Sequence, residues 1–124
     1  MARDPLYNGI NDGDLVTHKS ALTRGTDEYK VVKISDDKTV ALPSDGENFD
    51  GVVQVIAASD AAATVQEHGY VTVACSGGVS AGWKPLITDA VNGGVKLNGA
   101  PTTGDRYFRV VDTDTSGYVT FDLG

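Results

Sequence analysis

The residues best suited to acid–base, nucleophilic or metal chemistry are few and stand far apart in the sequence. His18 and His68 are the two histidines, and the acidic residues near each of them fall in turn-like sequence. Cys75 occupies the apolar face of a predicted strand, where neither a base nor an electropositive setting is visible to stabilise a thiolate. We therefore expect exposed or hydrogen-bonded histidines and a small, buried cysteine.

Two short segments imitate ligand-binding loops. Residues 112–117 (DTDTSG) match the first half of an EF-hand calcium loop, but Leu123 stands where the bidentate Glu of such a loop belongs. Residues 76–82 (SGGVSAG) are glycine-rich, yet they lack both the Lys-Ser/Thr ending of a phosphate-binding loop and the GxGxxG spacing. We interpret the first segment as a hairpin loop and the second as a set of turn glycines. The sequence thus predicts no enzyme, no metal site and no cofactor.

Length and composition limit the classes of protein that fit. A chain of 124 residues is expected to form one domain with a core of its own. One cysteine allows no internal disulfide, which favours synthesis in a reducing cytoplasm. We expect no signal peptide, because no apolar segment follows the opening MARDP, and no membrane span. The net charge of −7 argues against nucleic-acid binding, which depends on neutralising phosphates.

The chain is organised around residues 49–82, which hold the two clearest strand patterns. Residues 52–58 carry apolar side chains on both faces, as a strand buried on both sides does, and residues 70–76 alternate cleanly. Between them, residues 59–67 are long enough for a short helical turn capped by Ser59 or Asp60. Short strands with glycine-rich turns recur on both sides of this stretch. The prediction is an all-β fold: a compact sandwich or small barrel-like domain of short strands, with an extended N-terminal arm and at most one short helix.

Two segments are candidates for contact with other proteins. Residues 1–13 have no regular period, but Leu6, Tyr7 and Ile10 are apolar enough to dock; they form either a frayed terminus or an arm that orders on a neighbour. Residues 14–124 are expected to form the single β domain. Trp83, between Gly82 and Lys84, either packs at a subunit interface, where Trp is enriched, or caps one end of the domain's own core.

Residues 50–124 resemble the capsid decoration, or cement, proteins of tailed bacteriophages. The resemblance is carried by strand openings, turn glycines and alternating valines: Gly51-Val52-Val53, the Asp-Ala-Ala-rich 60–63, Gly69-Tyr70-Val71-Thr72-Val73, Gly77-Gly78, Val79-Ser80-Ala81-Gly82, Asp89 with Asn92-Gly93, Gly104-Asp105 and Gly117-Tyr118-Val119-Thr120-Phe121.

This resemblance implies a non-enzymatic protein that binds the outer surface of the assembled phage head. Such proteins clamp neighbouring major capsid proteins and commonly act as trimers at three-fold points. The implied partners are therefore the major capsid protein and further copies of this chain, with no nucleic acid and no membrane. The implied location is the outside of the virion, after synthesis in the host cytoplasm. Leu6, Tyr7, Ile10 and Trp83 are the candidate capsid or subunit contacts.

Two other functions remain open from the sequence. One is a tail, baseplate or fibre-associated β module that binds host glycans or other virion proteins, with Tyr7, Tyr70, Trp83 and Tyr107 lining a sugar groove. The other is a trimeric β enzyme such as a nucleotide hydrolase. The enzyme would need a cluster of carboxylates, which the sequence does not assemble.

Overall fold

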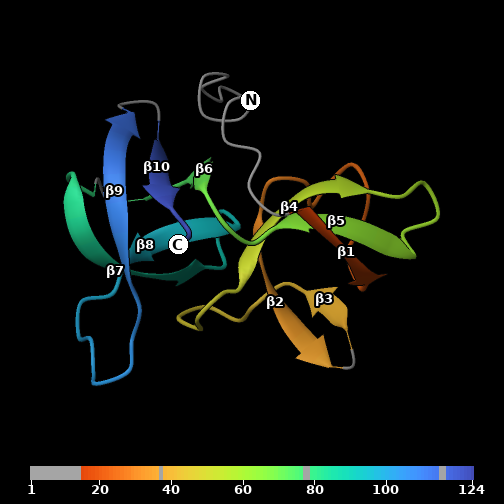
Figure 1. The fold of residues 1–124 in the computed structure, drawn as a ribbon, viewed down its shortest axis with the longest axis horizontal. Helices are drawn as coiled ribbons and strands as arrows, with labels where there is room; N and C mark the ends of the chain where they lie inside the picture. Colours follow the sequence, from red (N-terminus) through yellow and green to blue (C-terminus); the bar gives the residue numbers. More distant parts are fainter. Residues whose placement is uncertain (1–14, 37, 77–78, 115–116) are drawn as a thin grey trace.

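A computed structural model describes residues 15–36, 38–76, 79–114 and 117–124 of the chain. Within these residues it has ten strands and no helix. The strands are β1 (Leu15–Ser20), β2 (Val31–Asp36), β3 (Thr39–Ala41), β4 (Gly51–Ile56), β5 (Ala62–Gln66), β6 (Tyr70–Ala74), β7 (Gly82–Asp89), β8 (Gly94–Leu97), β9 (Tyr107–Asp114) and β10 (Tyr118–Asp122). The first five gather on one side of the molecule and the last five on the other (Figure 1).

Strands β1 to β5 form a closed barrel in the order β1-β3-β2-β4-β5. Four of its five strand pairs are antiparallel, and β1 meets β3 in parallel at Lys19 and Ser20 to complete the ring. The register of β4 against β5 shifts between Val53 and Val55. Such a bulge bends a strand and increases its twist, which a small barrel requires.

Strands β6 to β10 form a second sheet in the order β6-β10-β9-β7-β8. Its two outer strands come together where Cys75, just after β6, bridges Val95 of β8. Gly94 permits this approach, because a Cβ at that position would lie 1.8 Å from the carbonyl oxygen of Ala74. The second sheet therefore curls until its edges meet at one end.

The described residues form two hydrophobic cores. The barrel interior is wholly aliphatic and contains Leu22, Val32, Val40, Val53, Ile56, Ala63 and Val65. The second core is larger and lies between the barrel and the second sheet; it contains Val31, Phe49, Val52, Val71, Val73, Cys75, Val79, Leu86, Val95, Phe108, Val110, Val119, Phe121 and Leu123. Adjacent residues of β4 serve different cores, as the expectation of a strand buried on both faces requires.

Hydrogen bonds between the barrel and the second sheet converge on the end of β7. The Gly46 N–H donates to Thr88 O (2.9 Å) and the Thr88 N–H to Glu47 O (3.0 Å), so the loop before β4 pairs with β7 like a short strand. The Val31 N–H of β2 donates to Gly93 O (2.9 Å). These backbone contacts and the shared core fix the two sheets against each other.

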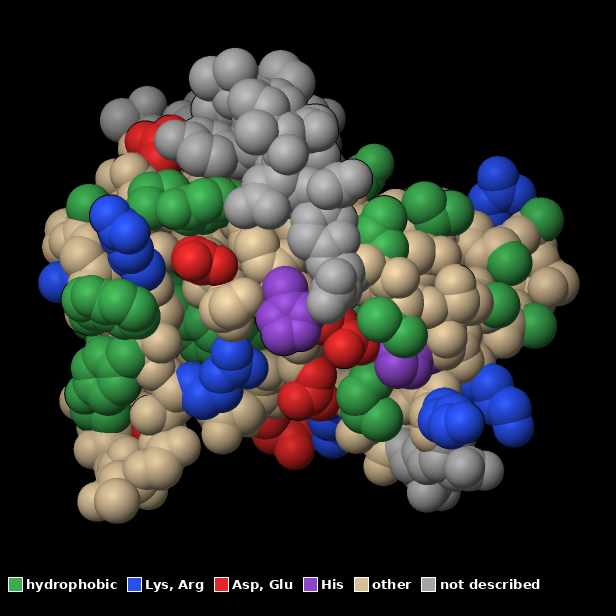
Figure 2. Space-filling model, viewed as in Figure 1, with side chains coloured by type: hydrophobic (Ala, Val, Ile, Leu, Met, Phe, Trp, Pro, Cys, Tyr) green, Lys and Arg blue, Asp and Glu red, His purple; other side chains and the backbone are tan. Residues whose placement is uncertain are grey.

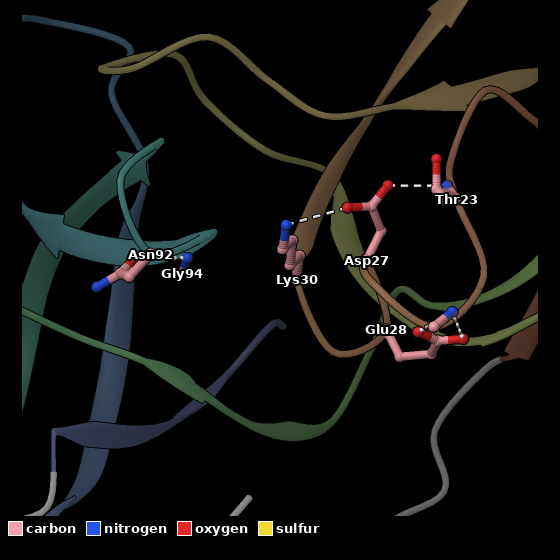
Figure 3. A network of polar contacts seen from close by, with 7 residues as sticks. Thr23, Asp27, Glu28, Lys30, Asn92 and Gly94 are labelled. Atoms are coloured by element: carbon pink, nitrogen blue, oxygen red, sulfur yellow. Dashed lines mark hydrogen bonds and ion pairs between the residues drawn. The ribbon is translucent and has the colours of Figure 1, made fainter.

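The barrel loop that faces the β7–β8 turn is held by its own side chains (Figure 3). The buried carboxylate of Asp27 accepts a hydrogen bond from the Thr23 N–H (2.8 Å) and pairs with Lys30 Nζ (3.0 Å). The aliphatic part of Lys30 lies over Gly93, where a Cβ would come within 2.6 Å of it. Gly93 has φ +76°, so the turn needs glycine there for its backbone as well as for space.

The predicted all-β class is confirmed, but one local prediction is wrong. Residues 59–67 form a turn and then β5, not a helical turn. The β-branched Thr64 and Val65 favour extended backbone, and β5 pairs on both edges, with β1 and β4. Asp60 does not cap a helix; it sits at φ 62° and accepts a hydrogen bond from the Arg24 N–H (2.9 Å).

Candidate functional site

The histidines occupy hydrogen-bonded positions that agree with the expectation from sequence. His18 Nε2 lies 2.7 Å from Glu67 Oε2, and His68 Nδ1 lies 3.1 Å from Gly124 O. Among the described residues, no group of three or more His, Cys, Asp or Glu side chains is placed to hold a metal ion. His18 thus links β1 to the residue that follows β5, and His68 links the turn before β6 to Gly124.

Cys75 is buried in the second core, and its surroundings oppose ionisation. Burial raises the pKa of its thiol, and the nearby Asp89 carboxylate raises it further. A protonated thiol is a poor nucleophile. Asp89 itself is buried and accepts a hydrogen bond from the Ser76 hydroxyl. Cys75 thus packs as a small apolar side chain, as predicted.

A shallow cleft of about 400 Å³ lies between the barrel and the second sheet. Its lining is Ile34, Asp50, Glu67, His68, Arg106, Leu123 and Gly124, and Figure 2 shows histidine and charged side chains gathered at the middle of this face. Several of these groups already have partners in the fold: Asp50 Oδ2 accepts from the Ile34 N–H (2.7 Å), and Arg106 Nη2 donates to Leu123 O (2.7 Å). The polar groups that line the cleft therefore serve mainly to join the two sheets.

The most exposed large apolar side chain of the described residues is Val91, with 94% of its surface in solvent. It stands in the turn 90–93 between β7 and β8, which we call the Val91 turn. The turn is tightly held: Asp89 Oδ1 accepts from the Val91 N–H (3.0 Å), and Asp89 O accepts from the Gly93 N–H (2.9 Å). Asp45 Oδ1 accepts from the Ala90 N–H (3.0 Å). A rigid turn thus holds a stiff, β-branched side chain in water, where it contributes nothing to the core.

Apolar groups continue beside the Val91 turn. Leu42 is 42% exposed, and it lines a cavity of about 70 Å³ together with Lys30, Val31, Pro43, Thr88, Ala90 and Gly93. The salt bridge from Lys96 Nζ to Asp45 Oδ2 (2.8 Å) fixes the neighbouring loop. The Val91 turn and this rim form an ordered apolar surface at the junction of the two sheets.

A second exposed surface lies on the outer face of the second sheet. Trp83 is 68% exposed and Tyr107 is 50% exposed, so Trp83 does not cap the protein's own core. Arg109 of β9 stands opposite Trp83 of β7, and Tyr107 lies two residues before Arg109 on the same face. Figure 2 shows hydrophobic side chains gathered on this side of the molecule, with Lys or Arg and Asp or Glu side chains close by.

One of these surfaces contains a contact residue predicted from the sequence, and the other does not. Trp83 is a predicted contact residue because of its type, whereas Val91 is not among the contacts predicted from the sequence. An apolar β-branched residue between turn-forming Asp89, Asn92 and Gly93 is the signal that was available. The candidate contacts Leu6, Tyr7 and Ile10 lie outside the described residues.

Comparisons of the chain with protein family models, with curated proteins and with solved structures find no match. The described part of the chain contains no helix of the length and apolar character needed to cross a membrane.

Proposed function

We propose that this protein is a capsid decoration protein of a tailed bacteriophage. It binds the outer surface of the assembled head and stabilises the shell by clamping neighbouring major capsid proteins. The proposal rests on the sequence resemblance and on one structural observation. Val91 is exposed to solvent on a turn whose backbone is held by hydrogen bonds. A binding protein of this kind needs ordered apolar anchors on a stable scaffold rather than a catalytic site.

The Val91 turn has the properties of such an anchor. Its backbone is fixed by hydrogen bonds to Asp89 and Asp45, so little conformational entropy is lost when a partner covers it. Burying a valine side chain contributes about 1.5–3 kcal/mol, which is modest for a single contact. Repetition of the contact around a symmetric oligomer multiplies its effect through effective concentration.

The proposed assembly is a homotrimer, and its remaining candidate contacts are the arm residues Leu6, Tyr7 and Ile10. An arm that orders on the shell adds contact area without changing the folded domain. Removing residues 1–13 should then weaken attachment to shells while leaving the melting temperature of the domain unchanged. A large fall in melting temperature would instead make the arm part of the core.

The proposal is tested by sedimenting undecorated expanded shells with the purified protein at micromolar concentration. We expect the protein to pellet with expanded shells and to stay in the supernatant with unexpanded precursor shells. Selective binding of the expanded state stabilises it by mass action, so decorated shells should also resist heating better than bare ones. Protein that remains in the supernatant with both kinds of shell contradicts the proposal.

A further inference from the structure

Four side chains are successive cross-strand partners in one row that follows the curved outer face of the second sheet. Tyr70 of β6 stands opposite Asp122 of β10, Asp122 stands opposite Arg109 of β9, and Arg109 stands opposite Trp83 of β7. Cross-strand partners in direct register project to the same face of a sheet. With strands about 4.8 Å apart, three intervals separate the backbones of Tyr70 and Trp83 by about 14 Å when measured along the curved sheet.

The row has aromatic residues at its ends and a charged pair at its centre. Tyr107 lies diagonally beside Trp83 and enlarges that end of the row. The three phenylalanines, by contrast, are all buried in the second core. The sheet therefore keeps its purely apolar rings inside, whereas Trp83 and Tyr107, whose rings also carry a polar group, are exposed and Tyr70 is half-buried.

The placement of charged residues at the centre of the row and aromatic residues at its ends is the reverse of that in a typical protein–protein interface. The centre of a protein interface is depleted of charged residues, and polar groups lie at its rim. Here Arg109 and Asp122 occupy the centre. A ligand that covers them must offer hydrogen-bond donors and acceptors along its middle, together with flat apolar faces at its ends.

An oligosaccharide has this combination. The C–H face of a pyranose ring stacks on an aromatic ring, whose face is electron-rich. Neighbouring hydroxyls accept from the guanidinium fork of Arg109 and donate to the carboxylate of Asp122. Asp122 Oδ1 also accepts from the Gly124 N–H (2.9 Å), which holds the carboxylate in place.

The charges of the row and of the whole chain indicate which class of sugar the row can bind. The row contains one basic and one acidic residue, and the whole chain carries a net charge of −7. An acidic glycan would gain nothing net from the row and would be repelled by the protein as a whole. We propose that the Tyr70–Asp122–Arg109–Trp83 row is a binding site for neutral oligosaccharides. This inference stands independently of attachment to a capsid.

The test is isothermal titration of the full-length protein with maltohexaose, cellohexaose, xylohexaose and mannohexaose, with an oligogalacturonate as the acidic comparison. We expect at least one neutral sugar to bind with a Kd below about 1 mM, with little dependence on salt. Trp83→Ala should weaken that binding about tenfold or more, since it removes a stacking surface. Arg109→Lys, which keeps the charge but loses the fork, should also weaken it.

Leu97→Ala is the matched control, because Leu97 is 49% exposed on the same sheet but lies outside the row. It should leave sugar binding unchanged. Binding of none of the neutral sugars, binding of the acidic sugar alone, or full affinity in Trp83→Ala would each overturn the proposal. If Trp83→Ala abolishes pelleting with shells while no sugar binds, the face is a protein contact instead.

Discussion

The barrel and the second sheet are built from similar short strands, but they bury different side chains. The barrel core is aliphatic and closed by its own strand pairs. The second core includes a cluster of three aromatic rings, in which Phe49 stacks on Phe108 (centroids 5.1 Å apart) and meets the edge of Phe121 (5.9 Å). Phe49 comes from the loop before β4, so the barrel side supplies one of the three rings.

This difference shows how the two parts depend on each other. The barrel has an interior of its own, whereas the second sheet completes its core with Val31, Phe49 and Val52 from the barrel side. Both exposed surfaces, the Val91 turn and the outer row, belong to the second sheet. The barrel therefore acts as the support that orders the part of the molecule that carries the candidate contacts.

The largest predicted effect follows from removing the ring that links the two parts. Phe49→Ala should lower the free energy of unfolding by about 3–5 kcal/mol. Urea unfolding followed both by Trp83 fluorescence and by far-UV circular dichroism should still show one coincident transition, because the cores share residues. Val65→Ala, inside the barrel alone, should cost about 2 kcal/mol. Two separate transitions in the wild-type protein would contradict this mutual dependence.

A slightly smaller effect is expected where the edges of the second sheet meet. Gly94→Ala should destabilise the protein by about 3 kcal/mol, because its Cβ would overlap the carbonyl of Ala74 and force the backbones apart. Gly99→Ala is the matched control, since nothing lies within 4 Å of a Cβ there, and it should change stability little. Equal melting temperatures for the two variants would show that β6 and β8 do not approach so closely.

A smaller effect on the free energy of unfolding is expected from lowering the pH. The hydrogen bond from Lys96, supported by that from the Ala90 N–H, lowers the pKa of Asp45 below its ordinary value. The Ser44 N–H and then Lys33 likewise lower the pKa of Glu47. Carboxylates whose pKa is lower in the folded state stabilise the protein above their unfolded pKa, and this contribution is lost as pH falls through the folded pKa.

Stability should therefore decline as the pH drops below the ordinary titration range of Asp and Glu. In Asp45→Asn the decline should be shallower, because one of the titrating groups is gone. The check is a series of denaturant melts between neutral pH and the acid limit of folding, with wild type and variant compared at each pH. Parallel curves would mean that Asp45 contributes no pH dependence.

The sequence predicted the all-β class and strands such as β6 because short-range signals carry that information. Alternating valines in β6 and glycine turns mark elements over a few residues. It did not predict β5, where alanine-rich sequence suits a helix and only pairing with β1 and β4 decides otherwise. Barrel closure at Lys19 and Thr39 likewise depends on contacts between segments distant in the chain.

The two candidate surfaces likewise combine local features, which the sequence shows, with contacts between distant segments, which it does not show. Residue type alone makes Trp83 a candidate contact, but its row with Tyr70, Asp122 and Arg109 depends on the register of four strands. The turn that exposes Val91 is held in place by Asp45, far away in the sequence, which accepts a hydrogen bond from the turn. Neither arrangement can be predicted from the local spacing of residues, since each joins segments that only the fold brings together.

The smallest predicted effect on stability accompanies the most direct test of function. Val91→Thr changes an exposed methyl to a hydroxyl and should alter the free energy of unfolding by less than about 0.5 kcal/mol. Val55→Thr makes the same change at a barrel residue that is 60% exposed. Sedimentation with expanded shells should show clearly weaker attachment for Val91→Thr and wild-type attachment for Val55→Thr. Wild-type attachment of Val91→Thr would contradict the proposed role of the Val91 turn as the anchor.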